Sequence, residues 1–205
     1  MMTASASPPS VLVTGGAQRI GRAIVERFAD ADWHIVIHYR ASGKEAEALA
    51  KTLPSAETVG FDLADTPALH AAVDGLADRL PNWRALICSA SGFDPDTPEA
   101  PDPAVWDAML DANLRGNAML AARFLEKTNA GQGRRIINLL DQKLANLNPD
   151  FFSYTVAKAG LKTAGEMLAM ARADSADRIF ALAPGLAMAS FDQTSAEFAE
   201  SGRMN

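Results

Sequence analysis

The fold is decided by the stretch Val11-Leu12-Val13-Thr14-Gly15-Gly16-Ala17-Gln18-Arg19-Ile20-Gly21-Arg22. Its apolar start indicates a strand, its glycines indicate a tight turn, and the residues from 20 onward have helical spacing. This layout suits a nucleotide diphosphate, because glycines let the backbone come close and a helix N-terminus presents unpaired N–H groups. The glycine pattern is imperfect, since Arg19 stands where the middle glycine would be, and a glycine pattern alone is a weak signal.

Strand and helix signals alternate along the rest of the chain. We expect strands at residues 10–13, 33–39, 57–61, 84–88, 135–140 and 178–183, and helices at 20–31, 43–53, 66–80, 104–129 and 151–173. This alternation indicates a parallel sheet, and near-continuous Val, Ile and Leu in the strands fits helices on both faces. The prediction is an α/β fold: a single Rossmann-type, doubly wound sheet over residues 10–205, after a disordered tail at 1–9.

Composition narrows the class of protein. The 205 residues are 48% apolar, which is enough for one sizeable core. The net charge is −6, and the sequence has no basic patch of the kind that a nucleic-acid partner needs. The single cysteine, Cys88, excludes an internal disulfide framework and fits a reducing compartment. We find no signal-peptide pattern and no run as long as a membrane span, so a soluble cytoplasmic protein without a membrane partner is expected. The three histidines form no metal-ligand cluster, so no metal is predicted.

The end of the second strand bears on the cofactor. A doubly wound sheet binds its ligand at the carboxyl ends of the strands, where an acid would hold the adenosine ribose of NAD. The sequence instead offers Arg40, Ser42 and Lys44, which could bind a 2′-phosphate. We therefore predict NADP(H), with a solvated basic loop as the alternative. Asp62, after the third strand, suits either a helix cap or a bond to the adenine amino group.

Tyr154 and Lys158 lie four residues apart on one predicted helix face. An adjacent ammonium would favour the phenolate, so we expect Lys158 to lower the pKa of Tyr154 and make it a usable acid or base. Taken alone, such a pair is usually structural.

Together these residues resemble the short-chain dehydrogenase/reductase family. The resemblance covers residues 10 to about 190 and rests on motifs in the family's order: Thr14-Gly15 to Gly21, Asp62-Leu63, Cys88–Ser91, Asn113, Tyr154 with Lys158, and Pro184-Gly185. Within the family the chain is most similar to pteridine reductases and dihydromonapterin reductases. Four details carry that match: Arg19 at the middle glycine, His38-Tyr39-Arg40 after the second strand, Ser91 and Phe93 after the fourth, and Asp141 in place of the usual catalytic serine.

The resemblance implies NADPH-dependent reduction of a pterin by an enzyme that is typically a homotetramer. It implies the catalytic residues Asp141, Tyr154, Lys158 and Asn113, with Asn117 as the competitor of Asn113. The implied cofactor-binding residues are Gly15, Arg19, Ile20, Gly21, Tyr39, Arg40, Ser42, Asp62, Leu63, Ala90, Lys158, Pro184 and Gly185. The implied substrate-binding residues are Ser91, Phe93, Asp141, Tyr154 and Arg19, with Phe93 stacking on the pterin.

Two departures from the family leave alternatives open. Cys88-Ser89-Ala90-Ser91 replaces the usual Asn-Asn-Ala-Gly, with Cys88 expected to be a small buried residue, and the sequence stops before the family's last strand, which is expected to be missing. The alternatives are a generic carbonyl reductase or alcohol dehydrogenase, and a non-catalytic NADP(H)-binding protein. At the level of single residues, Phe93 packing a proline-rich loop and Asp141 capping a helix are the structural alternatives.

Overall fold

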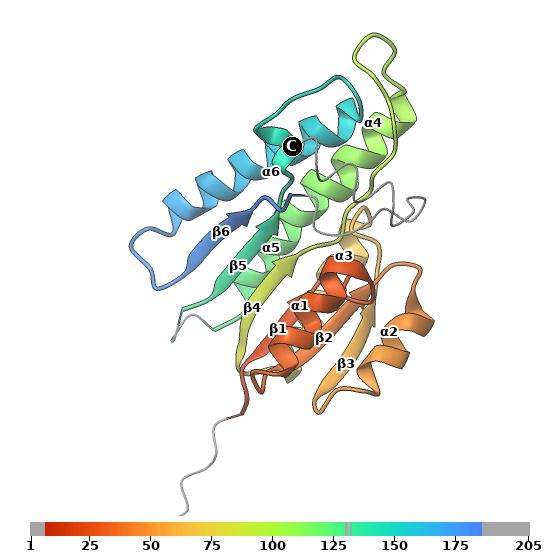
Figure 1. The fold of residues 1–205 in the computed structure, drawn as a ribbon. Helices are drawn as coiled ribbons and strands as arrows, with labels where there is room; N and C mark the ends of the chain where they lie inside the picture. Colours follow the sequence, from red (N-terminus) through yellow and green to blue (C-terminus); the bar gives the residue numbers. More distant parts are fainter. Residues whose placement is uncertain (1–6, 130, 132, 186–205) are drawn as a thin grey trace, which may run out of the picture.

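One parallel sheet forms the centre of the molecule in the computed structural model, which describes residues 7–129, 131 and 133–185. Its strands are β1 (Ser10–Val13), β2 (His34–Tyr39), β3 (Ala56–Gly60), β4 (Trp83–Cys88), β5 (Arg135–Leu139) and β6 (Arg178–Leu182). They lie in the order β3-β2-β1-β4-β5-β6 and every neighbouring pair is parallel (Figure 1). Because the order reverses between β1 and β4, a ligand crevice is expected at their carboxyl ends. The predicted doubly wound fold is confirmed.

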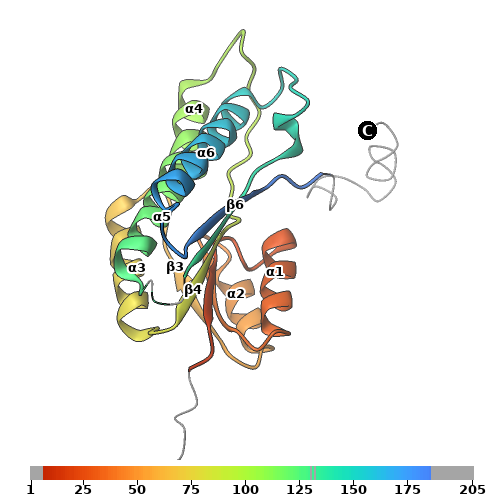
Figure 2. The ribbon, with the colours of Figure 1, turned by 90° about the vertical axis from the view of Figure 1, so that its left-hand side faces the viewer.

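Helices cover both faces of the sheet. Figure 2 shows α1 (Arg19–Ala29) and α2 (Gly43–Ala50) on one side, and α3 (Thr66–Arg79), α4 (Pro103–Leu110), α5 (Gly116–Lys127) and α6 (Phe152–Ala171) on the other. Two helix starts follow from local sequence. Asp65 caps α3 and Asp102 caps α4 through their carboxylates, each just before a proline in the first turn.

The predicted single helix over residues 104–129 is wrong in its middle. A π-helical turn at Asp111–Arg115 separates α4 from α5. Asn117 Nδ2 donates to the carbonyls of Ala112 and Asn113, both at 3.1 Å, within this wider turn. Gly116 lies so close to the loop after β3 that an added Cβ would meet the Leu63 carbonyl oxygen at 2.5 Å. Such single π turns are frequent at functional sites.

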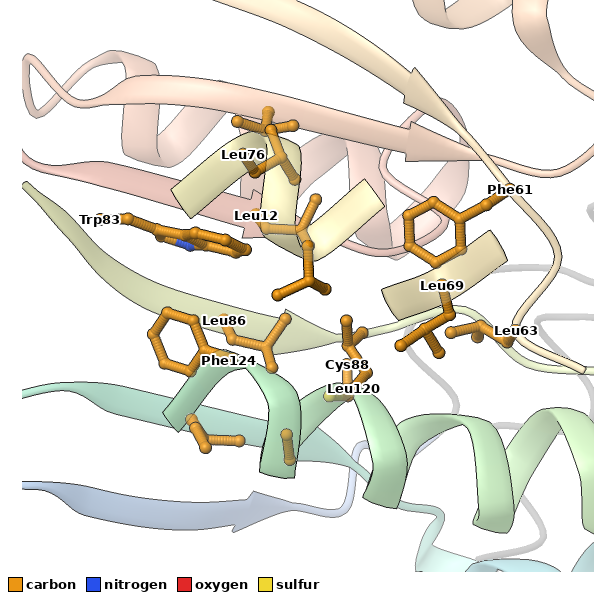
Figure 3. Packing of buried hydrophobic residues seen from close by; sticks show 14 residues of the cluster. Leu12, Phe61, Leu63, Leu69, Leu76, Trp83, Leu86, Cys88, Leu120 and Phe124 are labelled. Carbon is orange, nitrogen blue, oxygen red and sulfur yellow. The ribbon is translucent and has the colours of Figure 1, made fainter. Parts of the chain in front are cut away.

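The largest buried cluster lies between the sheet and helices α3 and α5, with Leu12, Leu86 and Trp83 of the strands facing Phe124 (Figure 3). Trp83 is fully buried, although its place at the start of a strand predicts only partial burial. Cys88 is buried as predicted, and burial raises the pKa of its thiol to about 12, which makes it unreactive.

The amino ends of β5 and β6 are joined by a buried ion pair. Both carboxylate oxygens of Asp177 accept from the Arg134 side chain, at 3.0 and 2.7 Å, and Arg172 donates to the same carboxylate from the end of α6. Arg134 Nη1 also donates to the carbonyls of Leu125 and Thr128 after α5. Asp177 is buried, and these charge-assisted bonds, led by those from Arg134, hold the pKa of its carboxyl group far below its usual range.

Two terminal predictions fall partly beyond this description. Of the predicted tail, residues 7–9 lead into β1, where the Pro9 carbonyl accepts from His34 N at 2.9 Å; residues 1–6 lie outside the described residues. The prediction for the end of the chain, residues 186–205, also falls outside them. Within the part of the chain that is described, no helix is long and apolar enough to cross a membrane.

Candidate active site

A cavity of about 830 Å³ opens at the carboxyl ends of the strands. Most residues that the sequence nominates for the site lie in its wall, and Asn113 and Lys44 do not; those in the wall are Gly15, Arg19, Ile20, Gly21, Tyr39, Arg40, Ser42, Asp62, Leu63, Ala90, Ser91, Phe93, Asp141, Tyr154, Lys158, Pro184 and Gly185. Residues that sequence reasoning did not nominate also line it: Gln18, His38, Ala41, Glu45, Ser89, Gly92, Ala112, Leu139 and Leu140. The ends of all six strands thus contribute to one wall, as a doubly wound sheet predicts.

The turn after β1 is shaped by two close approaches. Gly15 has φ +62°, and a Cβ there would meet the Ala90 backbone at 3.0 Å. A Cβ on Gly21 would meet the Gly15 carbonyl oxygen at 2.2 Å, so only glycine fits there. Thr14 fastens the turn to the end of β4, because its Oγ1 accepts from Ser89 N and Ala90 N at 2.9 Å.

Arg19 has the backbone conformation that a glycine would adopt most easily. Its φ is 49°, in the left-handed region that non-glycine residues rarely occupy. The arginine therefore keeps the geometry of the glycine it replaces while adding an exposed guanidinium at the cavity wall. Strain of this kind is typical of functional sites.

His38 holds the same turn from β2. Its Nδ1 lies 3.2 Å from the Gly15 N–H and its Nε2 lies 3.0 Å from the Phe61 carbonyl oxygen. The two partners require a neutral ring with the proton on Nε2, and burial lowers the pKa of His38 to about 4. His38 is thus a buried structural link between the glycine turn and the end of β3.

The predicted 2′-phosphate region needs two corrections. Lys44 is exposed and is not part of the cavity wall, whereas Glu45 is, so an acid does lie near Arg40 and Ser42. Lys44 and Glu45 are neighbours in the first turn of α2, and helix geometry points adjacent side chains to different sides. The ring of Tyr39 packs against the backbone of Gly43 and Gly60, where added Cβ atoms would meet it at 3.0 and 2.8 Å.

Asp62 makes a local turn rather than capping α3. Its Oδ1 accepts from Ala64 N at 2.9 Å, while Asp65 caps the helix by accepting from Ala68 N at 3.0 Å. Of the two roles that the sequence allows for Asp62, the helix cap is thus taken by a neighbour. Asp62 stays in the cavity wall.

Tyr154 and Asp141 form the polar centre of the cavity. The Tyr154 hydroxyl donates to Asp141 Oδ2 at 2.8 Å, and Asp141 Oδ1 accepts from Lys143 N at 2.8 Å. Asp141 therefore both caps the short 3₁₀ turn Gln142–Leu144 and binds the tyrosine. The expected lowering of the Tyr154 pKa is wrong, because burial and the Asp141 carboxylate raise it, outweighing the opposing effect of Ser91.

Lys158 is engaged elsewhere than at the phenol oxygen. Its Nζ donates to the Leu139 carbonyl at 2.7 Å and lies 5.7 Å from the centre of the Tyr154 ring. Burial lowers the pKa of Lys158 to about 8, against the favourable charge of Asp141. The sequence spacing places the two side chains on one face but does not reveal these other partners.

Asn113 contacts the loop after β4 instead of the cavity. From the π-helical turn, its Oδ1 accepts from Ser91 Oγ at 2.7 Å and from Gly92 N at 3.1 Å, and its Nδ2 donates to the Gly92 carbonyl. Asn117, the competing candidate, directs its amide to helix carbonyls. Asn113 therefore holds Ser91 in the wall beside Tyr154.

An aromatic group that includes Phe93 lies at the wall of the cavity. Phe93 is 53% exposed and stacks on Phe151, with ring centres 4.0 Å apart and planes at 13°. It also meets Tyr154 edge-on at 4.8 Å. Phe151 carries no recognisable sequence signal, because only the packing of the loop against α6 brings it to Phe93.

The arrangement suits reduction or oxidation of a flat organic molecule beside a dinucleotide. The turn and the first turn of α1 offer N–H groups to phosphates, and at the other end a phenol, a carboxylate and an ammonium surround the reacting position. In the described ranges, no three His, Cys, Asp or Glu side chains are grouped to hold a metal ion.

Comparisons with known proteins identify the family. A family model for short chain dehydrogenase matches residues 9–199. The structure of FolM alternative dihydrofolate reductase 1 from Brucella suis in complex with NADP is 36% identical, with a TM-score of 0.88, over 95% of this chain and 79% of that one.

Curated relatives are more distant and more varied. Sulfoacetaldehyde reductase 2 of Chromohalobacter salexigens is 27% identical over 88% of this chain and 73% of its own length. NADPH-dependent aldehyde reductase 2, chloroplastic, of Arabidopsis thaliana is 28% identical over 80% of this chain and 68% of its own length.

The family match spans nearly the whole chain, and the fold and cavity agree with it. The chain belongs to the short-chain dehydrogenase family of oxidoreductases.

Proposed function

We propose that the chain is an NADPH-dependent reductase of a pterin, of the dihydropterin-to-tetrahydropterin type. The observation that carries the proposal is the bond between Asp141 and Tyr154 beneath the exposed ring of Phe93, within one cavity. A carboxylate at this place accepts from the N–H groups of an amino-pyrimidine edge, and an exposed aromatic ring suits a flat bicycle. The likeness to a FolM dihydrofolate reductase supports the same substrate class.

The residues present fit a dinucleotide. Gly15 and Gly21 permit the tight turn between β1 and α1, because added Cβ atoms would collide with the backbone of Ala90 and Gly15, and Gln18 makes no side-chain cap bond at the start of α1. The cavity wall includes this turn, Arg40 and Ser42 after β2, and Lys158 of α6. In this proposal Arg19 contacts the pyrophosphate and the substrate, Arg40 and Ser42 hold the 2′-phosphate, and Lys158 holds the nicotinamide ribose. NADPH supplies the hydride when bound.

The protein's own residues then manage the proton. Because its pKa is raised, Tyr154 keeps its proton at neutral pH and can donate it to the reduced ring, directly or through water. Asp141 orients the Tyr154 hydroxyl and the substrate and takes part in protonation. Ser91, held by Asn113, adds a second hydroxyl on the same wall.

Carbonyl reduction is the second candidate, favoured by the aldehyde reductases among the relatives. Tyr154 and Lys158 serve that chemistry equally well. Asp141 serves it less well than the usual serine, because a carboxylate oxygen accepts hydrogen bonds, whereas a serine hydroxyl can donate one to hold the carbonyl oxygen. This difference makes pterin the first choice.

The substrate half of the proposal is tested with Phe93→Ala. Loss of the stacking face should weaken dihydropterin binding about tenfold or more, while NADPH binding changes little. Phe93→Tyr, which keeps a flat ring, is the matched control. Equilibrium titration of each ligand measures both constants, and equal weakening of the two would show that Phe93 only packs the loop.

The cofactor half is tested by comparing NADPH with NADH. Arg40→Ala should reduce the preference for NADPH, because a 2′-phosphate loses its charged partner. Glu45→Gln should increase that preference by removing a like charge from the wall. An enzyme that binds both cofactors equally, with no response to either change, would contradict the assignment.

The remaining features of the proposal concern the whole protein. We propose a single reductase domain over residues 10–205 that works in the cytoplasm as a homo-oligomer, a tetramer by family resemblance. Light scattering after size exclusion would measure the assembly, and a monodisperse active monomer would contradict it.

A further inference from the structure

The residue at the start of α6 supplies no side-chain cap for the helix. Phe151 occupies the N-cap position with φ 54° and makes no side-chain cap bond. The first N–H groups of a helix need acceptors, and Tyr154 lies within this first turn. Ser153 beside it is fully buried, so its polar atoms need partners inside the protein.

Asp96 supplies the cap from a distant loop. Its Oδ1 accepts from Ser153 N at 2.9 Å, its Oδ2 accepts from the Ser153 hydroxyl, and its backbone carbonyl accepts from Phe152 N at 3.3 Å. A carboxylate is favoured at a helix N-terminus both as an acceptor and as a negative charge. The contact therefore fixes the 91–103 loop to α6 across 57 positions of sequence.

The same contact sets the distance between two functional groups. Phe93 lies three residues before Asp96, and its ring packs on Phe151 and Tyr154 on either side of the capped pair. At its other end the loop is held by Asn113 through Gly92. The segment that carries Phe93 is thus fixed at two points, one on the π-helical turn and one on α6.

We propose that Asp96 is a positioning residue for the substrate: by capping α6 from the loop, it holds the Phe93 ring against Tyr154. This rests on the proposed function, since Phe93 is there the face on which the pterin stacks. Asp96 itself touches no reacting atom and is absent from the cavity wall.

A matched control lies in the same loop. Asp102 also caps a helix, by accepting from Ala104 N at 2.8 Å and Val105 N at 3.3 Å, but that helix is α4 and begins at the next residue. Both are aspartates that cap helices, yet only Asp96 joins the loop to the helix that carries Tyr154.

The test compares Asp96→Ala, Asp96→Asn and Asp102→Ala. Asp96→Ala should raise KM for dihydropterin about tenfold, with a change below about twofold in NADPH affinity, on the scale of a lost cap. Asp96→Asn keeps one oxygen acceptor and should recover part of the loss. Asp102→Ala should leave both constants near the wild-type values. Equal changes in the two alanine variants, or equal changes for pterin and NADPH, would overturn the inference.

Hydrogen exchange separates this inference from the proposed function. Asp96→Ala should speed exchange in both residues 91–96 and 152–158, whereas Asp102→Ala should do so only near 103–106. If the wild type does not turn over pterins but the two variants show these exchange changes, the substrate assignment fails and the positioning role stands. The effect of Asp96→Ala is then measured as a change in KM for the carbonyl substrate. If exchange in the two segments is unchanged in Asp96→Ala, the positioning role fails whatever the substrate.

Discussion

The two edges of the sheet hold their charged side chains in opposite ways. At the amino ends of β5 and β6, Arg134 and Asp177 are buried and bonded to each other and to nearby carbonyls. At the carboxyl ends, Asp141 and Tyr154 are bonded to each other but line an open cavity. The first arrangement has its donors and acceptors matched within the chain and holds the fold together. The second leaves polar capacity facing the cavity, which is what a ligand site requires.

Breaking the carboxyl edge should affect activity and hardly affect stability. Tyr154→Phe removes the proton donor, so kcat/KM should fall about 10²- to 10⁴-fold. The free energy of unfolding should change by only about 1 kcal/mol, because one partly exposed hydrogen bond is lost and the ring stays packed. Steady-state kinetics and urea denaturation measure the two effects. Unchanged activity would favour the non-catalytic NADP(H)-binding alternative.

Breaking the amino edge should do the reverse. Asp177→Ala leaves buried Arg134 without its partner and should reduce the free energy of unfolding by about 3–5 kcal/mol. The folded fraction of Asp177→Ala should keep the wild-type kcat, because the Arg134–Asp177 pair lies at the opposite end of the strands from the cavity. Asp74→Ala is the control: it removes the carboxylate that pairs with Arg123 at the surface and should cost far less. Similar losses for the two variants would remove the distinction between buried and surface pairs.

His38 sharpens the comparison, since it lies at the carboxyl edge yet is buried with both ring nitrogens bonded. Its pKa is about 4 in the fold against an ordinary value of 6.5, so the unfolded chain takes up the proton first. The contribution of neutral His38 to the free energy of unfolding is therefore complete above pH 6.5. About 3 kcal/mol of it is lost as the pH falls towards 4. Nearby Asp62 opposes the shift but does not outweigh burial.

The measurement is urea denaturation between pH 7.5 and 4 for the wild type and His38→Asn. The asparagine cannot titrate, so the difference between the two stability curves should narrow by about that amount as the pH falls. Parallel curves would show that His38 is not held neutral by the fold, and that this part of the edge resembles the open cavity.

Local sequence predicts the features that depend on neighbours along the chain. The strand pattern gives the parallel sheet, the glycines at 15 and 21 give the turn, and the four-residue spacing of Tyr154 and Lys158 puts both in the cavity wall. Resemblance to a family adds Asp141 and Phe93, which meet Tyr154 in the structure.

Sequence reasoning fails where the partner is far along the chain. The spacing of Lys158 gives no sign that Leu139 takes its ammonium or that Asp141 reverses the pKa shift of Tyr154. Asp96 resembles any loop acid until the fold brings it to α6, and Arg134 resembles a surface charge until Asp177 reaches it across 43 positions. The left-handed Arg19 shows a third limit, because a strained residue contradicts its own local preference.

The most direct measurement is steady-state NADPH oxidation with a dihydropterin, set against a panel of ketones, sugars and sulfoacetaldehyde. The carboxylate and aromatic face of the cavity predict a kcat/KM for the dihydropterin about 100-fold above that of any carbonyl compound, since a polar site rejects substrates that leave its groups unpaired. Efficient turnover of a ketone or aldehyde without turnover of the pterin would contradict the central claim.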